Sequence, residues 1–212
     1  MNDKITARTT KARPRARFVR ETADVRRQAL IEATARCLAE KGVGGTSVRA
    51  ICAQAGVSSG LLTHYFDGVD ALVLATYADV GAKVSAAIDS AVEAAGTDPR
   101  DRLRACLQAN FHAPILDPDL LATWIAFWSL VKTDPKIAAI HAEVYGGTRA
   151  QLETMLHAAA PAMVPAQARI AAISLTALVD GLWLELCLDP TIFSAGEAQA
   201  MVEAAMLRAL EP

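Results

Sequence analysis

The chain has 212 residues, a net charge of −2 and a hydrophobic fraction of 53%. This length allows one large domain or two small ones with a sizeable core. Val, Ile and Thr runs with alternating polarity are missing, which excludes a sheet protein and predicts an all-α fold. Cys37, Cys52, Cys106 and Cys187 form no C-x-x-C pair and lie in apolar stretches. They indicate reduced core residues of a cytosolic protein rather than disulfides.

The charge is distributed unevenly along the chain. Residues 1–27 contain nine Lys and Arg against three acidic residues, a net +6, so the remainder carries −8. A basic arm on an acidic body is expected where one end of a protein meets a polyanion. We therefore predict a flexible basic arm over residues 1–23. Its first part also has the composition of a disordered tail, and such a tail can still bind phosphate.

A helix-turn-helix is predicted over residues 47–66, SVRAICAQAGVSSGLLTHYF. Ser47 and Ser58 are placed to cap its two short helices by accepting backbone amides. Gly56 occupies the corner between them, where a positive φ angle favours glycine. The second helix carries short polar side chains on the face that would enter a major groove. An ordinary helical hairpin has the same spacing.

The segments that follow are separated by Asp-Pro pairs, in which aspartate can cap a helix and proline can occupy its first position. The pairs are Asp98-Pro99, Asp117-Pro118, Asp134-Pro135 and Asp189-Pro190. With these boundaries we predict nine helices, near residues 22–41, 47–55, 58–65, 69–94, 99–113, 118–132, 135–159, 165–188 and 195–210. The first is expected to stop at Gly42 and to complete a three-helix N-terminal domain over residues 24–84. Residues 85–212 would form a helical body.

An aromatic face is predicted on the helix near residues 118–132, because Trp124, Phe127 and Trp128 are spaced three and four apart. Trp183 lies on another helix with Asp180 and Glu185 close in sequence. Aromatic faces with a nearby carboxylate can bind a quaternary ammonium ion. Tryptophans at helical spacing also fill cores, and the spacing alone favours that interpretation.

The segment over residues 165–188 carries a stripe of small and apolar side chains at spacings of three and four. Such a helix can pack closely against a symmetric copy of itself. The stripe consists of Ala171, Ser174, Ala177, Leu178, Gly181 and Leu182.

Enzyme chemistry is not indicated. The four histidines, His64, His112, His141 and His157, form no pair with metal-ligand spacing, and no phosphate-binding loop or nucleophile elbow occurs. We expect no catalytic site, no metal and no cofactor. Residues 120–131 are too short to span a membrane, and residues 170–188 include Asp180 and Glu185, which are costly in lipid. The N-terminus lacks the apolar stretch of a secretory signal, so we expect a cytoplasmic protein.

The order of these features resembles the tetracycline-repressor (TetR) family of bacterial transcription regulators, from Arg26 to Leu210. The resemblance is carried by the GVSSGLLTHYF corner, by Trp124-Ile125-Ala126-Phe127-Trp128 and by ALVDGLWL at residues 177–184. The last two segments are similar to the choline-responsive members. One departure concerns the start of the fourth helix, where the family usually has a lysine near a DNA phosphate. Here Val69 follows Asp67 at that place.

The resemblance implies a homodimeric, ligand-responsive repressor that binds a palindromic double-stranded operator, in choline or glycine betaine metabolism. Its effector would be a small molecule such as choline or another quaternary ammonium, held by Trp124, Phe127, Trp128, Asp180, Trp183 and Glu185. The stripe would lie in the dimer interface. Base or nearby backbone contacts are expected from Ser58, Ser59, Gly60, Thr63 and His64, and backbone contacts from Ser47, Arg49, Tyr65, Arg17, Arg20, Arg26 and Arg27. The alternative is a helical small-molecule-binding or scaffold protein that does not read DNA.

Overall fold

The computed structural model describes residues 23–211, which form nine α-helices, one short 3-10 helix and no strand. The α-helices are α1 (Ala23–Gly45), α2 (Val48–Ala55), α3 (Ser59–Tyr65), α4 (Gly68–Ala94), α5 (Pro99–Gln108), α6 (Pro118–Leu130), α7 (Pro135–Ala159), α8 (Pro165–Leu188) and α9 (Ala195–Leu210), and the 3-10 helix is Ala109–Phe111. The all-α prediction is confirmed, with most boundaries within a few residues of the predicted ones. Arg17 and Arg20, with nearly all of the predicted arm, lie outside the described residues.

Local capping explains most of these boundaries. Ser47 accepts the Ala50 amide at 3.3 Å and Ser58 accepts the Leu61 amide at 3.3 Å, as predicted. Asp98, Asp117 and Asp134 cap α5, α6 and α7, each followed by proline in the first turn. Asp189 differs, because it ends α8 and accepts the Thr191 amide. Helix α9 begins instead at Ser194, which forms a capping box with Glu197.

The regular part of the first helix ends at Gly42, as predicted, because the backbone there has a φ of 62°, and a further turn after this kink carries α1 to Gly45. One predicted helix end was wrong. Helix α5 ends at Gln108 rather than near residue 113. The next residues tighten into the 3-10 helix, and the Asn110 side chain donates to the carbonyls of Cys106 and Leu107. A side chain that competes for helix carbonyls favours such a termination.

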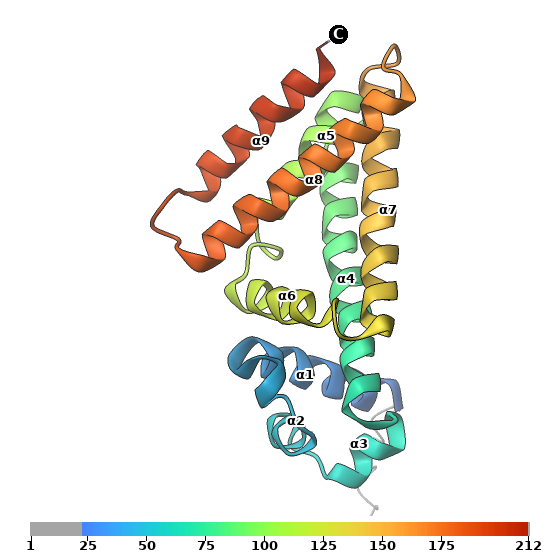
Figure 1. Ribbon diagram of the computed structural model, residues 1–212, viewed down its shortest axis with the longest axis vertical. Coiled ribbons are helices and arrows are strands. Elements are labelled where there is room, and N and C mark those ends of the chain that lie inside the picture. The colour runs from blue at the N-terminus through green and yellow to red at the C-terminus, as the bar shows by residue number, and fades with distance from the viewer. Residues whose placement is uncertain (1–22, 212) are drawn as a thin grey trace, which may run out of the picture.

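Helices α1–α3 form an N-terminal unit below the helical body in Figure 1. Its core contains Leu30, Cys37, Ile51 and Leu62, all 0% exposed, together with Leu72 of α4. Gly56 has a φ of 65° and makes the corner between α2 and α3. Burial of these apolar side chains orients α3 so that its opposite face remains in solvent.

The helical body is connected to this unit in two ways. Helix α4 runs without interruption from beside α3 up into the body, where it lies next to α7 (Figure 1). Helix α6 packs on α1 at the base of the body. The Thr123 hydroxyl of α6 lies 3.2 Å from the Ala35 carbonyl of α1 and 2.7 Å from the Asp119 carbonyl of its own helix, and it shares its one proton between them. The proposed domain boundary after residue 84 falls inside α4 and stays a prediction.

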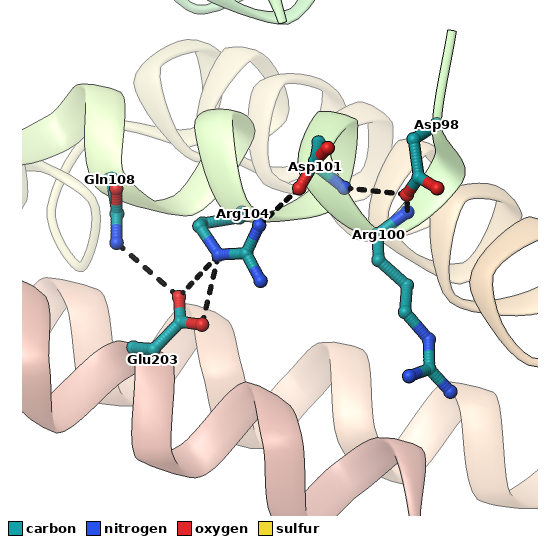
Figure 2. A network of polar contacts seen from close by, with 6 residues as sticks. All are labelled: Asp98, Arg100, Asp101, Arg104, Gln108 and Glu203. Carbon is teal, nitrogen blue, oxygen red and sulfur yellow. Dashed lines mark hydrogen bonds and ion pairs between the residues drawn. The ribbon is translucent and has the colours of Figure 1, made fainter.

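A polar network attaches α9 to α5 (Figure 2). Arg104 Nε lies 2.9 Å from each carboxylate oxygen of Glu203, and Gln108 donates to the same carboxylate at 3.3 Å. Asp101 pairs with the same arginine. Partly exposed ion pairs contribute little to stability, but the paired geometry fixes the position of α9 on α5.

Helices α4 and α8 are, by length and composition, long and apolar enough to cross a membrane. In this fold both pack against other helices of the body, α4 on α5 and α7, and α8 on α7 and α9. Core helices of soluble proteins have the same length and composition.

Candidate functional site

The exposed face of α3 is polar. Ser58, Ser59, Gly60, Thr63 and His64 are exposed, and Tyr65 is half-buried, with the centre of its ring 5.0 Å from the centre of the His64 ring. The Thr63 hydroxyl donates to the carbonyls of Ser59 and Gly60 at 3.3 and 3.2 Å, and its lone pairs remain available as acceptors. Ser47 and Arg49 are exposed at the start of α2. These groups can contact base edges and phosphates of a major groove.

Arg27 is held close to the end of α3. Its guanidinium carbon lies 5.0 Å from the centre of the Phe66 ring, and Phe66 is 7% exposed. A guanidinium on an aromatic face keeps its charge and its N–H donors. Arg26 is exposed on the same helix. Two cations are therefore placed on the unit that carries α3.

A partly open cavity of about 90 Å³ lies between α4, α5, α6, α7 and α8. This volume is several times the roughly 10–15 Å³ that one water needs. Its walls include the aromatic rings of Trp124, Trp183 and Tyr145. Among the described residues that line it, Asp180 is the one acidic side chain, and none is Lys or Arg. The exposed Ser85 of α4 and Gln151 of α7 lie at its outer side.

Tyr145 joins the tryptophans to the carboxylate. The indole N–H groups of Trp124 and Trp128 each donate to the Tyr145 hydroxyl at 3.2 Å. That oxygen has two lone pairs and one proton, so its own O–H points to Asp180 Oδ1, 3.4 Å away. The network holds the Asp180 carboxylate as an acceptor beside the aromatic walls.

Burial disfavours the charged form of Asp180 and raises its pKa from 3.8 to about 6, although the Tyr145 hydrogen bond and Arg149 act in the opposite direction. Desolvation and the charge of Asp180 also raise the pKa of Tyr145, which is therefore a phenol at neutral pH. The cavity thus contains a carboxylate that lacks a cationic partner on its walls.

The structure separates the predicted effector residues into two groups. Trp124, Asp180 and Trp183 line the cavity, whereas Phe127, Trp128 and Glu185 do not. Phe127 is 0% exposed and stacks on Tyr77 with ring centres 4.3 Å apart, so it is a core residue. Trp128 donates a hydrogen bond to Tyr145, and Glu185 is exposed. Tyr145 was missed, because its partners are 17 to 35 residues away in the chain and its helix gave no aromatic pattern.

The predicted stripe on α8 lies mostly on an exposed face. Ser174, Ala177 and Gly181 are exposed, and Ala171 and Leu178 are half-buried. Ile170 and Leu188 on the same helix are 66% and 67% exposed. Leu182 does not fit this surface, because it is 9% exposed and packs into the core of its own chain. A groove between the start of α8 and the end of α9 continues the apolar face, lined in part by Ile170, Ser174 and Ala209.

No cluster of three or more His, Cys, Asp or Glu side chains that could hold a metal occurs within residues 23–211. The four cysteines are free thiols; Cys37, Cys52 and Cys106 are buried and Cys187 is half-buried. A helix-turn-helix with an exposed polar helix, attached to a helical body that contains a cavity, is typical of a DNA-binding regulator with a ligand site.

The comparisons with known proteins agree with this class. The model of the BetI-type transcriptional repressor C-terminal domain matches residues 99–211, and the model of the tetR family of bacterial regulatory proteins matches residues 30–76. The HTH-type transcriptional regulator BetI of Burkholderia thailandensis is 37% identical over 161 residues, which cover 76% of this chain and 81% of that protein. The chain therefore belongs to the TetR family of transcription regulators and carries a BetI-type repressor domain.

Solved structures share the fold. A transcriptional regulator of Pseudomonas aeruginosa PAO1 has a TM-score of 0.81 and 43% identity, and the match covers 89% of this chain and 92% of that one. A regulator of Saccharomonospora viridis, solved in complex with choline, has a TM-score of 0.72 and 19% identity, covering 85% of this chain and 95% of that one. At that identity the second likeness concerns the fold alone.

Proposed function

We propose that this repressor responds to choline or a similar quaternary ammonium and controls genes of choline or glycine betaine metabolism in the cytoplasm. The observation that carries the proposal is the chemistry of the cavity wall. Trp124, Trp183 and Tyr145 surround a volume whose one acidic lining residue is Asp180, with no lining cation among the described residues. A regulator of the same fold, that of Saccharomonospora viridis, was solved in complex with choline, which supports the same effector class.

A quaternary ammonium needs this combination of groups. It has no N–H, so it binds through its charge and through the negative faces of aromatic rings, at about 2 kcal/mol or more per desolvated contact. Burial disfavours the charged form of Asp180, as its raised pKa of about 6 indicates. A bound cation next to this carboxylate would stabilise its charged form, which burial disfavours.

Calorimetry can test the effector. Choline and betaine aldehyde are expected to bind with micromolar to millimolar affinity, and the isosteric neutral alcohol 3,3-dimethylbutanol much more weakly. Asp180→Asn should weaken choline at least tenfold. Glu185→Gln is the matched control, because Glu185 is on the same helix but is exposed and outside the cavity.

Equal affinity for the neutral alcohol would contradict the proposal. So would full choline binding by a Trp124→Ala, Trp183→Ala double variant, since both rings would then belong to the core alone.

For DNA recognition we propose that α3 reads the operator and that the basic arm adds affinity independent of sequence. Val69 packs against the hydrophobic clusters of both the N-terminal unit and the body, so this position offers no cation to a phosphate. The arm would then carry more of the backbone attraction. A dimer of such units implies a palindromic operator.

Two variants separate these contributions. His64→Ala should cost roughly 1–3 kcal/mol at the operator and little on random DNA, because it removes a base contact. Deleting residues 1–20 should weaken binding to both DNAs and reduce the dependence of affinity on salt. The measurement is fluorescence anisotropy over a salt series. Equal losses on both DNAs for His64→Ala would exclude a role in base recognition. If the protein binds no genomic fragment at any salt concentration, the scaffold alternative is favoured.

A further inference from the structure

One buried donor in the cavity wall has no partner. Among the buried side-chain nitrogen and oxygen atoms of residues 23–211, Trp183 Nε1 makes no hydrogen bond, and Trp183 is 7% exposed. Its ring packs edge-on against Trp124 with centres 6.2 Å apart, and both rings line the cavity. An unpaired buried N–H costs roughly 1–3 kcal/mol, so native proteins rarely keep one without a purpose.

The neighbouring polar groups already have partners. Thr148 and Thr176 donate to the carbonyls of Val144 and Ala172 on their own helices, at 3.1 and 2.8 Å. The Asn110 amide donates to two backbone carbonyls, and Trp124 donates to Tyr145. Trp183 therefore differs from Trp124, although both are indoles on the same wall. Its N–H is a buried donor without a partner, on a residue whose ring lines the cavity.

We propose that Trp183 determines specificity by donating its Nε1–H to an oxygen atom of the effector. The site would thereby select quaternary ammonium ions that carry a neutral oxygen, such as a hydroxyl or a carbonyl. This inference rests on the proposed function, because the same cavity must bind the cation. The ring face of Trp183 attracts the cation and its edge binds the oxygen.

The charges around the cavity argue for a neutral oxygen rather than a carboxylate. No Lys or Arg lines the wall, and Asp180 is already negative there. Arg149 acts on Asp180 electrostatically but is not among the lining residues. A second carboxylate, as in a zwitterion, would be desolvated without a cation to pair with and would face Asp180.

The test compares two ligands that differ in one group. Choline has a hydroxyl where propyltrimethylammonium has a methyl of similar size. The wild-type protein should bind choline about tenfold or more tightly, since one hydrogen bond to a buried donor is at stake. In Trp183→Phe this ratio should fall to near one, because phenylalanine keeps an aromatic face and lacks the N–H. Both affinities are measured by calorimetry.

Trp124→Phe is the matched control. It also removes an indole from the wall, but one whose N–H is used by Tyr145. It should weaken both ligands and leave the choline preference intact. A wild-type ratio near one would overturn the inference without any variant, and so would a preserved ratio in Trp183→Phe. Failure of both ligands to bind wild-type protein would instead overturn the proposed function on which it rests.

Discussion

At the scale of single residues, the half-buried Asp180 carboxylate destabilises the folded protein when it is charged. Its pKa of about 6 exceeds the ordinary 3.8, so the folded state binds more protons than the unfolded state between pH 4 and 6. The unfolding free energy therefore falls as pH rises through that window and stays lower above it. Asp180→Asn removes this destabilisation.

We expect Asp180→Asn to be more stable than wild type by roughly 1–3 kcal/mol at pH 7 and equal to it below pH 4. Urea denaturation at both pH values measures this. The exposed Glu185→Gln should change neither value. Lower stability of Asp180→Asn at pH 7 would mean that Asp180 has a favourable partner in the folded protein.

The same residue makes effector binding depend on pH. A cation needs the charged carboxylate, so choline affinity should be constant above the Asp180 pKa of about 6 and fall about tenfold per pH unit below it. Binding stabilises the charged form, so protons should be released near pH 6. Calorimetry in buffers of different ionisation enthalpy detects that release. A flat profile from pH 5 to 8 would remove Asp180 from the cation site.

Residue roles could be predicted from the sequence only where they depend on neighbours in the chain. The caps at Ser47 and Ser58 bind amides three residues away, so local sequence suffices to identify them. Trp124 and Phe127 are also close in sequence, yet one lines the cavity and the other stacks in the core. Tyr145 on α7 contacts the Asp180 carboxylate on the neighbouring helix α8. The packing of the helices decides which side of a ring meets a cavity, and the spacing of residues in the sequence does not specify that packing.

At the scale of elements, one face of α8 packs into the core of its own chain and another face is exposed. We call the exposed face the seam. Leu175 and Leu182 are buried within the chain, while Ala177 and Gly181 point to solvent beside exposed Ile170 and Ile173. A Cβ on Gly181 would meet no atom within 4 Å, so the seam is open in one chain. Small residues at these positions allow close approach of a symmetric copy.

Ala177→Arg is expected to separate the dimer, because the seam would have to bury an unpaired charge. The substitution points to solvent in one chain and should leave the fold intact. Sedimentation at micromolar concentration should show monomer with an unchanged helical circular dichroism spectrum. Ala139→Arg, at an exposed position of α7, is the matched control and should remain dimeric. A dimeric Ala177→Arg protein would place the interface elsewhere.

At the scale of the whole molecule, α6 is common to the cavity and the DNA-binding unit. Trp124 on α6 lines the cavity, and the preceding residue, Thr123, is 3% exposed and bonds the Ala35 carbonyl of α1. A ligand that shifts α6 must therefore move α1 or break this contact. Since α1 packs on α2, the displacement changes where α3 lies relative to its symmetric copy. An effector that shifted α6 would thereby favour one of two separations of the DNA-binding units.

This coupling must be reciprocal. If saturating choline weakens operator binding by some factor, saturating operator must weaken choline binding by the same factor, typically about 5–150-fold. Thr123→Val keeps the side-chain shape and removes the hydrogen bond to α1, so it should reduce both factors together while choline affinity without DNA stays near wild type. Thr133→Val is the control, because that hydroxyl is exposed and bonds the Leu130 carbonyl of its own segment. Calorimetry measures the dissociation constant of choline with and without operator, and anisotropy measures that of the operator with and without choline. An unchanged factor in Thr123→Val would assign the coupling to α4, the other helix that joins the body to the DNA-binding unit.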